Sequence, residues 1–169
     1  MDSKKPKRLF FNINHKIFYI VSIVVFLLLS ALAVNMAWLR TSREARRQAL
    51  VISDTIALTL NIDLLKDLTL SSDDLQNYNY IVLKSKFEKL VEANENIRFV
   101  YLFKLEGDNL LFAVDSEPIT SLDYSPPGQE YTEATDAYIE DFKKGISFVT
   151  SATTDRWGTW ITTVSPIKD

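Results

Sequence analysis

The sequence predicts an α+β protein in which an N-terminal transmembrane helix continues into a long helix, followed by an antiparallel sheet with helices on one side. Three observations predict this fold. An uncharged apolar segment runs from Ile17 to Trp38, a helical apolar pattern follows it, and short strand patterns separated by turns fill the second half. The expected order is helix, helix, strand, strand, helix, strand, strand.

The uncharged segment determines the domain organisation. At about 1.5 Å per residue its length matches a hydrocarbon core of about 30 Å. We therefore expect a basic cytoplasmic tail over 1–16, a transmembrane helix over 17–39 and one domain outside the cytoplasm over 40–169. A cleaved signal peptide is the rival interpretation, because Ala31 and Ala33 resemble a cleavage site. The apolar run continues past them, which favours a retained anchor.

Charge and composition exclude several classes. Five basic residues precede the apolar segment and four follow it closely, so the positive-inside rule favours a cytoplasmic N-terminus by only one charge. The chain has no cysteine, which excludes disulfides and thiolate metal sites. Its basic residues flank the apolar segment rather than alternate with aromatic residues, so we expect no nucleic-acid partner.

A helical apolar stripe follows the membrane segment. It consists of Ala45, Ala49, Ile52, Ile56 and Leu60, spaced by three or four residues, and neither glycine nor proline interrupts it. The helix should therefore continue out of the membrane unbroken. The stripe either packs against its own domain or forms the seam of a parallel homodimer, for which we select the first four residues. Both interpretations can hold along different turns.

The later elements follow from turn and cap signals. Ser71 to Asp74 offers cap side chains for a second helix that ends near Asn94. Two aromatic and branched runs, 98–105 and 110–114, flank a turn and predict an antiparallel hairpin. The remaining expectations are a loop over 115–131, a helix over 136–144 closed by Gly145, a strand over 146–150, a turn over 153–158 and a strand over 159–165.

The sequence offers little for catalysis. The only histidine is His15, at the foot of the membrane helix, so no Ser-His-Asp or Cys-His arrangement is possible across the membrane. The four glycines stand singly and form no phosphate loop. Metal binding would need carboxylates such as Asp115 and Asp155, which are isolated in sequence. We therefore expect no catalytic residue, no metal and no cofactor.

Three segments resemble a known family. They are Phe99-Val100-Tyr101-Leu102-Phe103, Ser125 to Tyr131, and Thr154-Asp155-Arg156-Trp157-Gly158-Thr159-Trp160 followed by Ser165 to Asp169. Together they resemble the extracytoplasmic PAS-like, or Cache-type, sensor domains of bacterial membrane-bound histidine kinases, over roughly 17–169. The family's sheet has a fifth strand, followed by a second membrane helix and an output domain. The resemblance therefore implies that this chain is an N-terminal fragment.

The resemblance also implies a ligand site between the concave face of the sheet and its covering loops. Arg156 would pair with an anion, Trp157 and Tyr131 would form flat walls, and Asp115 would hold an amine. Tyr101 completes the candidates. Structural alternatives stand beside each role: Arg156 pairs with Asp115 or with Asp155, and the tryptophan and Tyr101 pack in the core.

The expected function is the input module of a two-component sensor histidine kinase in the inner membrane. It would bind a small molecule outside the cytoplasm and shift the packing of the membrane helix within a homodimer. Kinase activity would belong to the intact receptor, since these residues hold no catalytic site. Two alternatives remain: the input domain of a diguanylate cyclase or chemoreceptor, and a membrane-tethered interaction protein without a ligand.

Overall fold

The computed structural model describes residues 15–156 and 158–168. It divides into two compact units, residues 1–45 and 46–169. Helix α1, His15–Thr59, supplies the described part of the first unit and continues into the second, with 45 residues and none buried. This confirms the predicted unbroken continuation of the apolar segment. By length and composition α1 is able to cross a membrane.

Two short helical elements and one longer helix follow α1. They are α2 (Asp63–Lys66), the 3₁₀ helix η1 (Ser72–Gln76) and α3 (Tyr78–Glu92). The predicted start at Ser71 begins η1, where its hydroxyl accepts from Asp73 N–H. Helix α3 has a separate cap, because the Asn77 side chain accepts from Asn79 N–H at 2.8 Å. One predicted helix is therefore two elements.

The predicted hairpin is confirmed. Strand β1 (Tyr101–Glu106) pairs antiparallel with β2 (Asn109–Asp115), with Gly107 at φ +66° in the turn and an irregularity between Leu102 and Phe103. One face of the hairpin packs against the helices. The buried cluster there consists of Leu68, Tyr80, Leu83, Phe87, Ala113 and Val114, with Val100 and Leu102 packed against it.

The second edge of β2 is also paired. Backbone hydrogen bonds run from Gly128 N–H to Phe112 O, from Phe112 N–H to Gln129 O and from Tyr131 N–H to Leu110 O, at 2.8–2.9 Å. Gly128 has φ +83°, and a Cβ there would lie 2.2 Å from the carbonyl oxygen of Leu70. Part of the predicted loop over 115–131 is thus held as extended backbone beside the hairpin.

The remaining elements are α4 (Asp136–Lys143), β3 (Phe148–Val149), β4 (Thr153–Asp155), β5 (Gly158–Trp160) and β6 (Thr163–Val164). Strand β3 pairs with β6, and β4 pairs with β5. The predicted turn over 153–158 is therefore too long, because 153–155 and Gly158 lie in strands and the turn is at Arg156, and the predicted strand over 159–165 divides in two. It divides because Thr162 N–H donates to the side chain of Thr150 rather than continuing the β4–β5 ladder.

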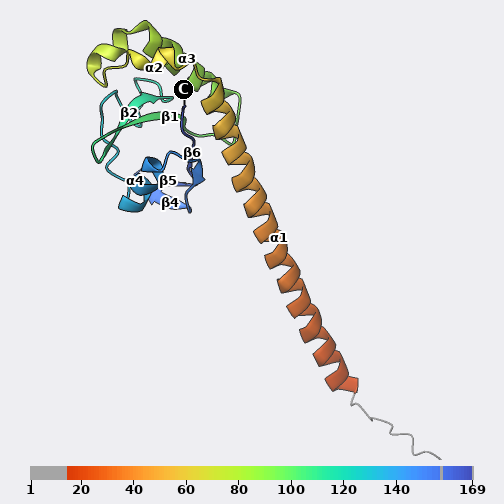
Figure 1. Cartoon of the computed structure of the whole chain (residues 1–169). Helices are drawn as coiled ribbons and strands as arrows, with labels where there is room; N and C mark the ends of the chain where they lie inside the picture. The colour runs from red at the N-terminus through yellow and green to blue at the C-terminus, as the bar shows by residue number, and fades with distance from the viewer. Residues whose placement is uncertain (1–14, 157, 169) are drawn as a thin grey trace, which may run out of the picture. The chain divides into compact units, whose positions relative to one another are not determined.

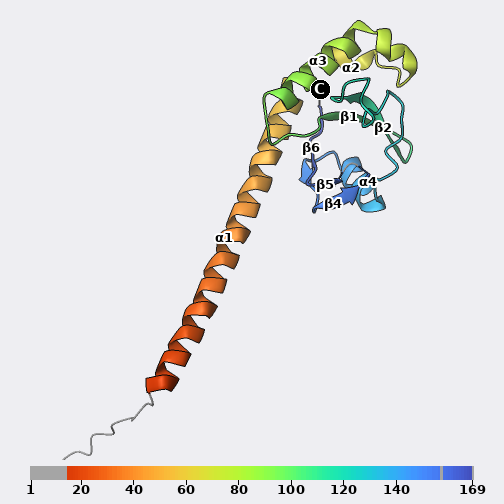
Figure 2. The same cartoon turned by 180° about the vertical axis from the view of Figure 1, so that it is seen from behind.

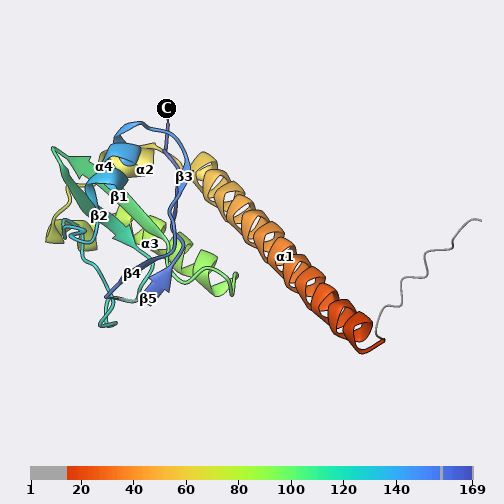
Figure 3. The same cartoon turned by 90° about the horizontal axis from the view of Figure 1, so that it is seen from below.

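The structure also corrects the expected single sheet with helices on one side. The described residues form three two-stranded antiparallel sheets. Within the second unit, α2 and α3 lie on one side of the β1–β2 hairpin and α4 lies on the other (Figures 1 and 2). A third view shows β3 running beside the end of α1 (Figure 3). The α+β class with small antiparallel sheets is confirmed.

Candidate functional site

The hairpin face that points away from α3 carries a continuous row of aromatic rings. Alternate residues of the β1 segment, Phe99, Tyr101 and Phe103, begin the row because successive strand side chains point to opposite faces. Neighbouring ring centroids lie 4.8–6.1 Å apart, within the range of favourable aromatic pairs. The members of this aromatic row are Phe99, Tyr101, Phe103, Phe112, Tyr131, Tyr138, Phe148 and Trp160.

The hydroxyl of Tyr138 is an unsatisfied polar group within this row. Its Oη is buried and has no hydrogen-bond partner among the described residues. Burial raises the pKa of Tyr138, and the nearby Tyr131 raises it further, so the phenol stays neutral. A buried unpaired hydroxyl costs about 1–3 kcal/mol. A polar atom of a bound molecule or an ordered water would remove that cost.

The structure brings two of the predicted ligand residues together. Tyr101 and Tyr131 both contact Phe103 and Phe112 in the aromatic row. Arg156 Nε lies 3.1 Å from Glu133 Oε1, and half of the arginine side chain is exposed. Arg156 thus forms an ion pair with Glu133, an alternative that the sequence did not suggest. Trp157 lies outside the described residues.

Asp115 has a different environment. It is fully buried at the end of β2, where Oδ1 accepts from Glu117 N–H at 2.8 Å and Oδ2 from Ser125 N–H at 2.7 Å. Desolvation outweighs these two bonds and raises the pKa of Asp115 to about 6. Both carboxylate oxygens therefore hold the loop that follows β2, which favours a structural role over the predicted contact with a ligand amine.

A buried lysine fastens the same loop. Lys84 of α3 donates to the backbone oxygens of Asp115, at 3.0 Å, and of Glu117. Its ammonium lies 4.9 Å from the centroid of the Tyr124 ring. Glu117 in turn pairs with Arg98. Nothing in the sequence pattern predicts this network, because a lysine within a helix usually faces solvent and its carbonyl partners can belong to any residue type.

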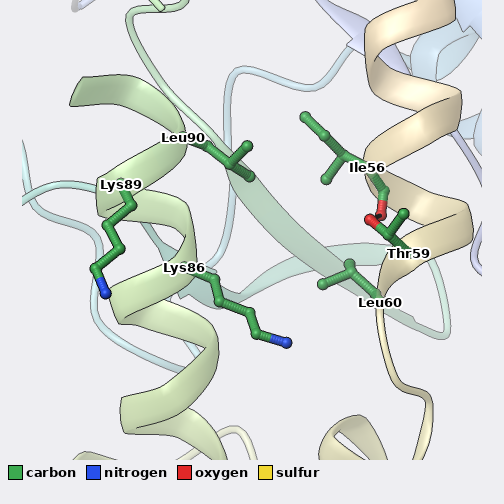
Figure 4. A pocket seen from close by; sticks show the side chains of 6 residues that line it. All are labelled: Ile56, Thr59, Leu60, Lys86, Lys89 and Leu90. Carbon is green, nitrogen blue, oxygen red and sulfur yellow. Dashed lines mark hydrogen bonds between the residues drawn. The ribbon is translucent and has the colours of Figure 1, made fainter. Parts of the chain in front are cut away.

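The residues predicted for the dimer seam differ in their exposure to solvent. Ala45 and Ile52 are exposed, whereas Ala49 and Ile56 are half-buried. Ile56 lies on a groove of about 370 Å³ between the end of α1 and α3. Figure 4 shows Ile56 facing Leu90 across it. The groove is lined by Ile56, Thr59, Leu60, Lys86, Lys89 and Leu90. It offers apolar walls and two cations, and none of the predicted ligand residues that the structure describes lines it.

A polar cluster joins α1 to the β3–β6 sheet. Asp54 accepts hydrogen bonds from Ser147 Oγ at 2.5 Å and Ser165 Oγ at 2.6 Å, and Ser53 Oγ lies 2.9 Å from Ser165 Oγ. We call these four residues the Asp54 cluster. The two hydroxyl donors hold the pKa of Asp54 below its ordinary value. The only sequence signal was a carboxylate beside the apolar stripe, and it named no partner.

Comparison with known proteins adds no further identification. No family model, no curated protein and no solved structure matches the chain. The likeness to Cache-type sensor domains therefore stays a prediction, based on the three quoted segments. Within the described residues, the site provides an aromatic face with one buried hydroxyl that has no hydrogen-bond partner, an Arg156–Glu133 ion pair, and a polar connection to α1.

Proposed function

We propose that the chain is a membrane-anchored, extracytoplasmic input module of a two-component sensor histidine kinase. One observation carries the proposal: a single unbroken helix supplies both the apolar segment and a stretch that is hydrogen-bonded to the folded unit. A change in that unit can therefore reach the anchor without crossing a flexible linker. This continuity supports a role in transmission more than a role in simple tethering.

The ligand site of this module is the aromatic row. Ligand sites are typically apolar and aromatic with a few polar groups that fix orientation. The row has that composition, with flat rings and the unpaired Tyr138 hydroxyl. Glu133, close in sequence to Tyr131, and its partner Arg156 add charge. The ligand is thus a small flat molecule with a hydrogen-bonding group that reaches Tyr138.

The module works as a homodimer. Ala45 and Ile52 are exposed on α1, as are Val51 and Leu58, of which Leu58 is 87% exposed. Anchoring confines two copies to one plane, which raises their effective concentration and favours parallel pairing through such a surface. Ligand binding would shift the population of two helix arrangements, and the kinase domain of the intact receptor would read that shift.

A topology experiment tests the anchor. Reporter fusions after Lys16 and after Ser165 should report opposite compartments, the first cytoplasmic and the second extracytoplasmic. Equal signals from both fusions would contradict an anchored extracytoplasmic module. A mature protein that begins near Val34 would contradict the retained anchor.

A binding screen tests the site. The full chain in lipid nanodiscs is screened against a library of small metabolites by thermal shift, and bound mass is measured by native mass spectrometry. A genuine ligand should lose affinity in Tyr138→Phe, which removes only the hydroxyl. It should keep its affinity in Tyr78→Phe, a matched control whose side chain is largely exposed on α3. Equal loss in both variants, or no ligand in the screen, would favour an interaction protein without a ligand.

A further inference from the structure

We infer that the Asp54 cluster is the coupling point through which the β3–β6 sheet reports the state of the aromatic row to α1. The inference rests on the proposed function and names how that site is regulated. One face of the β3–β6 sheet contacts the aromatic row, and the serines that flank the two strands contact the carboxylate of Asp54.

The β3 side shows this arrangement in two adjacent residues. Phe148 belongs to the aromatic row, with its ring centroid 5.4 Å from that of Tyr138. Ser147 precedes it and donates to Asp54 Oδ1 at 2.5 Å. Adjacent residues of extended backbone point in opposite directions, so one step along the chain leads from the aromatic row to α1. A displacement of the Phe148 ring therefore acts directly on the Ser147 hydrogen bond.

The β6 side ends on the same carboxylate. Val164 of β6 is paired with Phe148, and Ser165 follows it. Ser165 Oγ donates to Asp54 at 2.6 Å. A further bond runs from Arg46 Nη1 to Thr150 O at 2.8 Å, about two helical turns earlier on α1. Both strands of the sheet are thus fixed to one side of α1, and no other element needs to intervene.

The chemistry of the cluster suits a switch better than a permanent joint. The bonds are short and come from small side chains, so a displacement of about 1 Å takes a hydroxyl out of hydrogen-bonding range. The residues are half-buried, so water can replace a lost donor. An apolar contact would tolerate the same displacement by sliding. Hydrogen-bonded and released arrangements therefore give α1 two discrete states, which a ligand at the aromatic row biases.

A double-mutant cycle on the full chain in nanodiscs tests this coupling without any ligand. Phe148→Leu perturbs the aromatic row, and hydrogen exchange of the α1 segment 46–59 is followed by mass spectrometry. Phe148→Leu should raise exchange there by about threefold or more, the factor expected for coupled neighbours. In an Asp54→Ala background, which removes the acceptor of both serine hydroxyls, the same substitution should add nothing. In an Asp63→Ala background it should keep its full effect, because Asp63 is an exposed carboxylate that pairs locally with Lys66.

The result that overturns the inference is additivity, meaning that Phe148→Leu changes exchange in α1 by the same factor in the Asp54→Ala background as in the unchanged protein. If Asp54→Ala does not fold, the double variant Ser147→Ala and Ser165→Ala removes the same two hydrogen bonds, and the same criterion applies. A failed ligand screen would end the proposed function and leave this coupling intact. Additive exchange in a chain that does bind a ligand would end the coupling alone.

Discussion

On one face of the β1–β2 hairpin, Leu102 and Val114 pack against α3 in an apolar cluster that includes Leu83 and Phe87, both at most 1% exposed. The other face carries aromatic rings that are half-buried apart from the fully buried Phe112, and it meets strands of two or three residues. The first face has the density of a folding core. The second has short ladders and polar joints, which are the properties of regions that open at low free-energy cost.

The two carboxylates in these regions show the same contrast. Asp115, between the hairpin and α3, is fully buried and its pKa is raised to about 6. Asp54, at the β3–β6 sheet, keeps access to solvent, and its hydroxyl donors lower its pKa. One carboxylate holds a loop against a rigid layer at an energetic cost. The other makes favourable bonds that can be broken and remade.

The largest expected effect is the loss of stability on truncating a side chain in the core face. Phe87→Ala leaves a cavity in the buried cluster, and we expect the free energy of unfolding to fall by about 3–5 kcal/mol. Phe148→Ala, in the half-buried row, should cost less than half of that amount. Denaturant unfolding of the full chain in nanodiscs, followed by tryptophan fluorescence, measures both. Equal losses would contradict the division into a rigid and a yielding face.

The second effect is the pH dependence that arises from Asp115. Its folded pKa of about 6 lies above the ordinary value of 3.8, so the folded state binds the proton more tightly. The free energy of unfolding should therefore be greatest below about pH 4 and fall as the pH rises through 6. At about 1.4 kcal/mol per pKa unit, the fall approaches about 3 kcal/mol.

Other carboxylates also titrate in the acid range, so the test compares the pH dependence of the unchanged protein with that of an Asp115 variant. The decline between pH 4 and pH 7 should be lost in Asp115→Asn, whatever the absolute stability of that variant. Lys84 and Glu117 face the same carboxylate and remain in place in this comparison. An identical slope in both proteins would show that Asp115 ionises normally.

The sequence predicts a region well where the region depends on local patterns, and poorly where it depends on pairing between distant segments. The continuous α1, the hairpin turn at Gly107 and the helix that begins at Asp136 were predicted because periodicity, turns and caps are local. The pairing of β3 with β6 was not, since strands of two residues carry no period, and the next pair, Thr150 and Thr162, is joined by one backbone bond and one bond to the Thr150 hydroxyl.

The candidate site divides in the same way. The sequence offers Tyr131 as a flat wall of the site and Tyr101 as a further candidate, and the structure joins the two through other rings. Lys84 and Asp54 were missed as functional residues. Their partners are backbone oxygens and serine hydroxyls from segments far along the chain, and serine hydroxyls and carbonyls occur throughout any sequence. Such partners become visible only once the fold is known.

A smaller effect concerns the unpaired hydroxyl on the aromatic face. Tyr138→Phe removes a buried group that has no partner among the described residues, so we expect it to raise the free energy of unfolding by about 1 kcal/mol. Replacing a satisfied tyrosine hydroxyl lowers that free energy instead. Thermal unfolding of the variant beside the unchanged protein distinguishes the two. A loss of stability would mean that Tyr138 already has a partner, and would remove the main polar anchor from the proposed ligand site.

The last expected effect, similar in size, concerns Asp54, and it is the sharpest comparison between the two regions. Asp54→Asn replaces a charged acceptor of two hydroxyl bonds by a neutral one, and water reaches the half-buried site, so we expect a loss of about 1 kcal/mol near pH 7. Because the folded pKa is lowered, the contribution of the carboxylate is complete above about pH 4 and is lost as the pH falls through the folded pKa. The difference between the two proteins should therefore vanish in strong acid, whereas the Asp115 comparison changes between pH 4 and pH 7.

Asp63→Asn on the exposed surface serves as the control and should leave the stability almost unchanged, because solvent screens its local ion pair. A loss of several kcal/mol at Asp54 would mean that the β3–β6 joint is as rigid as the core, and a switch at that position would then be too costly to operate.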